Sequence, residues 1–236
     1  MKVGVFDSGI GGLTILKALI DKYPHHEYIY YGDTIHVPYG IKTKDEIIKY
    51  ANNIIKFLEK NGVSIIVIAC GTVSSNIKYL DSNVKLIDVL SPLNNKLDKY
   101  KCVSIIATPL SIRLNKFKEY IHTDLNLISA PSLVPIIESN DYKDLDNVLK
   151  DYLKSTNKSD ALLLGCTHYP IIKEYIEKYY KNDIITLDMY LLDIFKNFED
   201  GNSSLKLYFS YLNDNIITNV KKILNKENIE IEEILC

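Results

Sequence analysis

Residues 63–72 read VSIIVIACGT, and residues 161–168 read ALLLGCTH. Each segment is a short apolar run that leads into a cysteine, Cys70 or Cys166, with a threonine within the next two residues. The first run is rich in β-branched residues and does not alternate with polar ones, which is typical of a parallel strand buried on both faces. The two cysteines are 96 positions apart, so the repeated pattern predicts two related halves, each with a thiol at a strand end.

Outward from these segments, apolar runs of strand length alternate with amphipathic stretches. This alternation predicts an α/β fold with parallel sheets. The expected strands are 3–6, 28–31, 63–69, 86–90, 102–107, 125–128, 160–164 and 184–187. The expected helices are 13–20, 43–60, one starting near Ser74 or Ser75, 144–152, one starting at Pro170, and 203–224. The pattern of residues 229–235 does not decide between helix, strand and loop.

Composition excludes several classes of protein. The 236 residues are 47% hydrophobic and carry a formal net charge of −2, so nothing indicates a nucleic-acid partner. No apolar run approaches the roughly 18 residues of a membrane span. The apolar stretch at the N-terminus ends at Asp7, which is too short for a signal peptide. We therefore expect a cytoplasmic protein whose four cysteines are free thiols.

Three predicted strand ends carry polar or reactive side chains: Asp7-Ser8, Cys70-Gly71-Thr72 and Cys166-Thr167-His168. Ligands of parallel sheets gather at the carboxyl ends of the strands. The helices that follow offer free backbone N–H groups and partial positive charge, which suit a small ligand with carboxylates. Such a helix end can also lower the pKa of a nearby thiol.

Other interpretations of these residues remain open. A single cysteine after a strand is usually a core residue, and we assign Cys102 and Cys236 to this class. Cys70, Cys166 and His168 are plausible zinc ligands, although no fourth ligand is evident. His168 could instead activate Cys70 in a thiol hydrolase, which leaves Cys166 unexplained.

The glycines at positions 9, 11 and 12 resemble a nucleotide-binding loop. They fail the G-x-G-x-x-G spacing because position 14 is threonine. We therefore expect a tight turn into a helix and no dinucleotide site.

A reaction that uses two thiols accounts for more of the pattern. Inversion of a stereocentre needs one group to remove a proton from one face and another to deliver a proton to the opposite face. Cys70 and Cys166 on opposite walls of a cleft could do this, with Asp7 and His168 as neighbours that tune the thiols. The alternative roles are a helix N-cap for Asp7 and a surface or helix-start position for His168. The sequence thus favours an amino-acid racemase.

Several blocks of sequence resemble the bacterial glutamate racemases. The similarity runs in order from residue 3 to about residue 170, and its most specific parts are Phe-Asp-Ser-Gly and Cys-Thr-His-Tyr-Pro. The matching blocks are 5–14, 32–34, 37–40, 69–72, 107–109, 134–138 and 164–170.

The resemblance implies two α/β domains related by pseudo-twofold symmetry with the active site between them. Domain A would comprise residues 1–91 and 188–236, and domain B residues 92–187. It implies interconversion of L- and D-glutamate without cofactor or metal, for peptidoglycan synthesis. The implied catalytic residues are Cys70, Cys166, Asp7, His168 and Glu138. The implied substrate-binding residues are Asp7, Ser8, Tyr39, Gly40, Gly71, Thr72, Thr167 and His168.

Three positions depart from the family pattern. Gly71 replaces an asparagine that helps to hold the substrate, His36 replaces a common arginine, and Ser91 replaces a frequent glutamate. A racemase for aspartate or for several amino acids is therefore an alternative. A weakened homologue that binds DNA gyrase is another, although such a protein would not need both cysteines. Members of the family often form homodimers.

Overall fold

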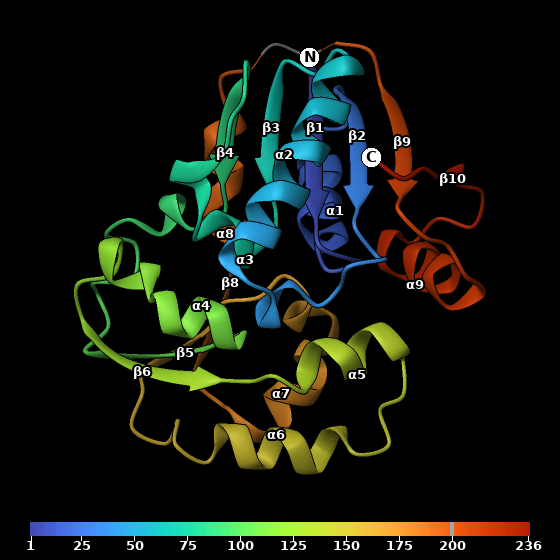
Figure 1. Cartoon of the computed structure of the whole chain (residues 1–236). Helices are drawn as coiled ribbons and strands as arrows, with labels where there is room; N and C mark the ends of the chain where they lie inside the picture. The colour runs from blue at the N-terminus through green and yellow to red at the C-terminus, as the bar shows by residue number, and fades with distance from the viewer. Residues whose placement is uncertain (199–200) are drawn as a thin grey trace.

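The computed structural model of the chain describes residues 1–198 and 201–236, and its strands form two separate sheets (Figure 1). All neighbouring strands in both sheets are parallel, which confirms the predicted fold class. The first sheet has the order β10-β9-β2-β1-β3-β4, and the second has the order β6-β5-β7-β8. The strands are β1 Lys2–Asp7, β2 Glu27–Gly32, β3 Ile65–Ile68, β4 Lys85–Asp88, β5 Cys102–Ala107, β6 Asp124–Ser129, β7 Ala161–Leu164, β8 Asp183–Thr186, β9 Ser204–Phe209 and β10 Ile231–Glu233.

The two sheets repeat one arrangement. Counted from its own first strand, each contains the order second-first-third-fourth, so β1 corresponds to β5 and β3 corresponds to β7. The registers agree as well, because Val3 of β1 pairs with the first residue of β3 and Val103 of β5 pairs with the first residue of β7. Cys70 and Cys166 therefore follow corresponding strands, as their spacing predicted.

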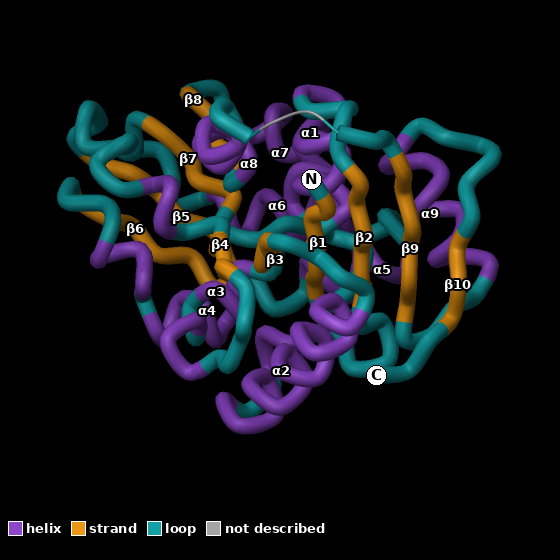
Figure 2. The backbone as a smooth tube through the Cα atoms, turned by 90° about the horizontal axis from the view of Figure 1, so that it is seen from above, coloured by secondary structure: helices purple, strands orange, loops and turns teal. Residues whose placement is uncertain are grey.

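Helices cover both faces of the first sheet (Figure 2). Leu13, Leu16 and Leu19 of α1 belong to the core on one face, and α2 contributes to the core on the other. The helix α2 begins where expected, because Thr43 and Glu46 form a capping box. The helices are α1 Leu13–Lys22, α2 Lys44–Lys60, α3 Gly71–Ser74, α4 Pro109–Leu114, α5 Leu133–Ser139, α6 Leu145–Leu153, α7 Lys173–Tyr179, α8 Asp188–Leu191 and α9 Asp214–Leu224.

The predicted helix over residues 203–224 is wrong in its first half. Residues Ser204–Phe209 form β9, which pairs with β2, and only Asp214–Leu224 are helical. Leu205, Leu207 and Phe209 contribute to one core and Tyr208 to the other, as the period of a strand requires. The undecided tail contains β10, which extends the first sheet beyond β9.

The helix expected near Ser74 begins earlier, at Gly71, with Cys70 as its N-cap. It has only four residues, and the chain then continues into a 3₁₀ turn at Ile77–Tyr79. Across the described part of the chain, no helix combines the length and apolar character needed to cross a membrane.

Candidate active site

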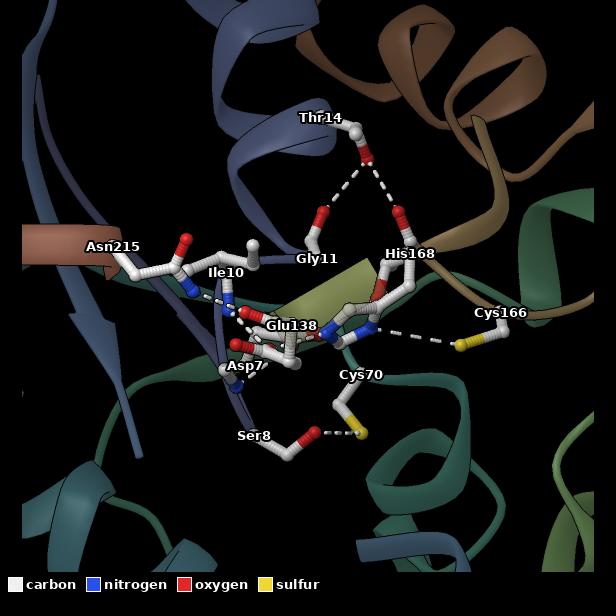
Figure 3. Close-up of polar contacts among 12 residues, drawn as sticks. Asp7, Ser8, Ile10, Gly11, Thr14, Cys70, Glu138, Cys166, His168 and Asn215 are labelled. Atoms are coloured by element: carbon white, nitrogen blue, oxygen red, sulfur yellow. Dashed lines mark hydrogen bonds and ion pairs between the residues drawn. The ribbon is translucent and has the colours of Figure 1, made fainter. Parts of the chain in front are cut away.

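The two predicted thiols line one small cavity between the two sheets. Cys70 is 5% exposed and Cys166 is 7% exposed, and they approach this cavity from the ends of β3 and β7 (Figure 3). The cavity is narrow: the free space around its lining atoms is about 290 Å³, and this figure includes space open to the solvent. Its lining residues are Ser8, Pro38, Tyr39, Gly40, Cys70, Gly71, Thr72, Thr108, Val134, Gly165, Cys166, Thr167 and His168.

Cys70 lies in an environment that keeps its thiol protonated. Burial, and after it the carboxylate of Asp7, raises the pKa of Cys70 to about 12. The backbone N–H of Val73 and the hydroxyl of Ser8, whose Oγ is 3.7 Å from the sulfur, act in the opposite direction but do not outweigh burial. The start of α3 therefore acts on the pKa of Cys70 in the expected direction, through the Val73 N–H, but burial raises that pKa by more.

Cys166 lies next to a linked base and acid, the buried His168 and the partly buried Glu138. His168 Nδ1 is 3.7 Å from Cys166 Sγ, and His168 Nε2 is 2.6 Å from Oε1 of Glu138 (Figure 3). Burial disfavours the charged imidazole, but the contacts with the Cys166 sulfur and the Glu138 carboxylate outweigh it. The pKa of His168 is therefore raised well above its ordinary value. The resulting imidazolium can stabilise a thiolate beside it.

Asp7 lies behind the cavity and does not line it. The side chain is fully buried, and it accepts hydrogen bonds from the Gly9 N–H at 3.0 Å and the Thr167 hydroxyl at 2.9 Å. Burial raises its pKa, against the opposing effects of His168 and these hydrogen bonds. The N-cap of α1 is Gly12, so the capping role considered for Asp7 is wrong. His168 is 1% exposed, so a surface role for it is wrong too.

The glycine-rich loop after β1 lets the second half of the chain approach closely. A Cβ atom on Gly11 would overlap the His168 ring, and one on Gly9 would overlap the Glu138 carboxylate. These glycines therefore leave space for the second half of the chain, in addition to forming the predicted turn.

The remaining predicted residues are joined by hydroxyl contacts. Tyr39 donates to Asp33 Oδ2 at 2.5 Å, and Thr72 Oγ1 lies 3.0 Å from Thr108 Oγ1. Gly40 packs against Thr108, where a Cβ atom would lie 2.6 Å from the threonine Cβ. Sequence reasoning gave no role to Asp33 or Thr108. Thr108 follows β5, so the strand-end rule could have identified it.

Of the positions that depart from the family pattern, Gly71 lines the cavity and His36 does not. Gly71 lies in its wall, and a Cβ atom there would be 2.9 Å from the backbone oxygen of Gly165. His36 stacks on Tyr50 with ring centroids 3.9 Å apart and contacts Asp33, so it is outside the lining.

Cys102 and Cys236 do not line the cavity, and all four cysteines are free. Their assignment to the core is wrong: Cys102 is half-buried because it opens β5, and Cys236 is exposed as the last residue. Within residues 1–198 and 201–236, no three His, Cys, Asp or Glu side chains are grouped as metal ligands would be. A wider crevice is lined by Thr14 and Lys17 of α1, by Asn219 of α9 and by residues between 142 and 188, and it includes neither cavity thiol.

Comparisons with known proteins agree with this geometry. No family model matches the chain. The glutamate racemase of Aquifex pyrophilus is 36% identical over 243 residues, which cover 96% of this chain and 95% of that protein. The crystal structure of the Francisella tularensis glutamate racemase in complex with D-glutamate superposes with a TM-score of 0.89 at 31% identity and covers 99% of this chain and 97% of that one.

An aspartate racemase of Picrophilus torridus shares only the fold, with a TM-score of 0.63 and 22% identity over 79% of this chain and 89% of that one. Identity of at least 30% over nearly the full length of both chains, together with the matching fold, decides the assignment. The chain belongs to the glutamate racemase family.

Proposed function

We propose that this protein racemises glutamate by transferring protons at Cα through Cys70 and Cys166, without an organic cofactor or a metal, and that it supplies D-glutamate for peptidoglycan. One observation carries the proposal: two thiols at corresponding strand ends line the same small cavity. The names of the relatives support glutamate as the substrate. We also propose that residues 1–91 with 188–236, and residues 92–187, are the two domains that enclose the substrate.

The proposed reaction is a transfer of one proton in and one proton out. A thiolate removes the Cα proton from one face, so the Cα–H bond breaks and an S–H bond forms. The opposite thiol then donates its proton to the other face, which restores Cα–H with inverted configuration and leaves a thiolate. The surroundings of the two sulfurs differ: burial keeps the Cys70 thiol protonated, whereas Cys166 lies beside the His168 imidazolium.

The Cα–H group of an amino acid is a very weak acid. The site must therefore stabilise the substrate carbanion that exists between the two proton transfers. Donors that hold the substrate carboxylates in a water-poor cavity provide this stabilisation. We assign this task to Ser8, Tyr39, Gly40, Gly71, Thr72 and Thr167. Asp7 holds the Thr167 hydroxyl, and Glu138 holds His168 beside Cys166. The near-complete burial of both thiols supports a cavity that excludes water once it is closed.

Isotope exchange tests the proposal directly. We expect the purified protein to racemise L-glutamate in deuterated water, with loss of circular dichroism and one deuterium at Cα of the product. The rate should be unchanged by hydroxylamine, which traps pyridoxal phosphate, and by EDTA. L-aspartate and L-alanine in the same assay test the broader racemase, and a Cys70→Ser/Cys166→Ser double variant serves as the blank. Absence of both signals with glutamate would rule out the proposed activity.

At position 71 we expect glycine to support a higher activity than the asparagine of the family pattern. Gly71→Ala should lower kcat/KM about tenfold and Gly71→Asn by more, because the added Cβ meets the backbone oxygen of Gly165, which cannot rotate away as a side chain can. Gly4→Ala is the matched control, since its Cβ would meet only side-chain atoms at 3.2 Å or more. A gain in kcat/KM with Gly71→Asn would show that the two halves separate here in solution.

A further inference from the structure

Glu138 connects the two halves of the molecule at the active site. It lies on α5, whereas the backbone N–H of Ile10 that donates to its Oε1 at 3.0 Å belongs to the loop after β1. The same carboxylate oxygen is 2.6 Å from His168 Nε2. The position of one carboxylate therefore determines how His168 is held beside Cys166 (Figure 3).

The C-terminal helix α9 holds the backbone of the same residue. Asn215 Nδ2 donates a hydrogen bond to the carbonyl oxygen of Glu138 at 2.6 Å (Figure 3). Glu138 is the penultimate residue of α5, and the last carbonyls of a helix have no partner within it. Asn140, at φ 56°, then ends α5. The side chain of Asn215 thus supplies a donor to a carbonyl at the helix end.

Asn215 is itself held in a fixed place. It lies in the first turn of α9, whose start is fixed by Asn213, because the side chain of Asn213 accepts from the Ile216 N–H at 2.8 Å. Along its length α9 packs against α1, the helix that follows the Gly9–Gly12 loop. The donor to the Glu138 backbone and the donor to the Glu138 carboxylate therefore come from elements that are packed together.

We propose that Asn215 is a positioning residue that, by holding the backbone of Glu138, sets the contact between Glu138 and His168 and so the charge beside Cys166. The effect of Asn215 on catalysis rests on the proposed function. Its effect on the contact between Glu138 and His168 does not, because the protonation of His168 can be measured without turnover. The charged or titratable groups that act on His168 are Cys166, Glu138 and Asp7, and Asn215 adds none.

The test compares Asn215→Ala with Thr218→Ala in the full-length protein. Thr218 is exposed on the same helix, and its hydroxyl donates to the Asp214 carbonyl of that helix, so its loss reports general weakening of α9. Two measurements are made: kcat/KM against pH, and the NMR titration of the His168 ring, whose signals are those missing in a His168→Gln variant.

We expect Asn215→Ala to lower kcat/KM about fivefold at neutral pH, the usual effect of one lost hydrogen bond. The basic limb of its pH profile and the His168 titration should both move to lower pH, because a looser Glu138 stabilises the imidazolium less. Asn215→Gln should restore part of the shift, and Thr218→Ala should change neither measurement.

Two results would overturn the proposal: a His168 titration in Asn215→Ala that coincides with the wild type, or an equal shift in Thr218→Ala. If the wild-type protein racemises nothing, the proposed function fails, while the titration still decides whether Asn215 positions the pair.

Discussion

Cys70→Ser and Cys166→Ser are each expected to lower kcat/KM for glutamate racemisation by about 10³-fold, because each removes the only thiol lining its side of the cavity. A serine hydroxyl is of similar size but is far too weakly acidic to give up its proton at neutral pH. Cys102→Ser is the matched control, since Cys102 opens β5 and lies outside the cavity lining. It should racemise glutamate at nearly the wild-type rate.

Isotope exchange distinguishes the loss of one proton carrier from general damage. L- and D-glutamate have equal free energies, so kcat/KM must be the same in both directions and cannot reveal which face is affected. In deuterated water, the remaining thiol of each variant should still exchange the Cα proton of one enantiomer without inversion. We expect the two variants to exchange opposite enantiomers. Near-normal turnover by either variant, or exchange of the same enantiomer by both, would contradict the two-thiol mechanism.

The part of this site that could be predicted from sequence is the part set by local patterns. An unbroken apolar run followed by a reactive residue indicates a buried parallel strand and the edge at which ligands bind. The rule identified both Cys70 and Cys166. It succeeded at both because the two sheets have matching strand orders, so the two cysteines follow corresponding strands. The same rule applied to β5 would have identified Thr108, which lines the cavity.

The remainder depends on contacts between distant residues. Residues 204–209 alternate as a strand does, but the polar and apolar residues that follow also fit a helix, and only pairing with β2 decides the matter. Asn215 and Glu138 are 77 residues apart, and nothing in the sequence around either residue predicts the hydrogen bond between them. Likewise, the need for glycine at positions 9 and 11 comes from His168 and Glu138, which approach from the other half of the chain.

Glu138→Gln is expected to lower kcat/KM about 100-fold at neutral pH. Glutamine has nearly the same shape, and its amide oxygen can still accept the Ile10 N–H, so the substitution removes the charge and leaves the connection between the two halves. Without the carboxylate, burial of the imidazole is opposed only by Cys166 and Asp7, and the pKa of His168 should fall. The basic limb of the kcat/KM profile should then move to lower pH, in the same direction as for Asn215→Ala but further.

The same substitution predicts a pH-dependent change in stability, and its sign follows from the raised pKa of His168. A histidine whose pKa is raised on folding contributes stability in full below its unfolded value of about 6.5. The contribution is lost as the pH rises through the folded value. The difference in unfolding free energy between the wild type and Glu138→Gln should therefore be largest near pH 6 and smaller at pH 9, in urea titrations at each pH. A difference that grows with pH would mean that His168 is neutral in the folded protein, and the imidazolium assigned to the Cys166 side of the cavity would have to be abandoned.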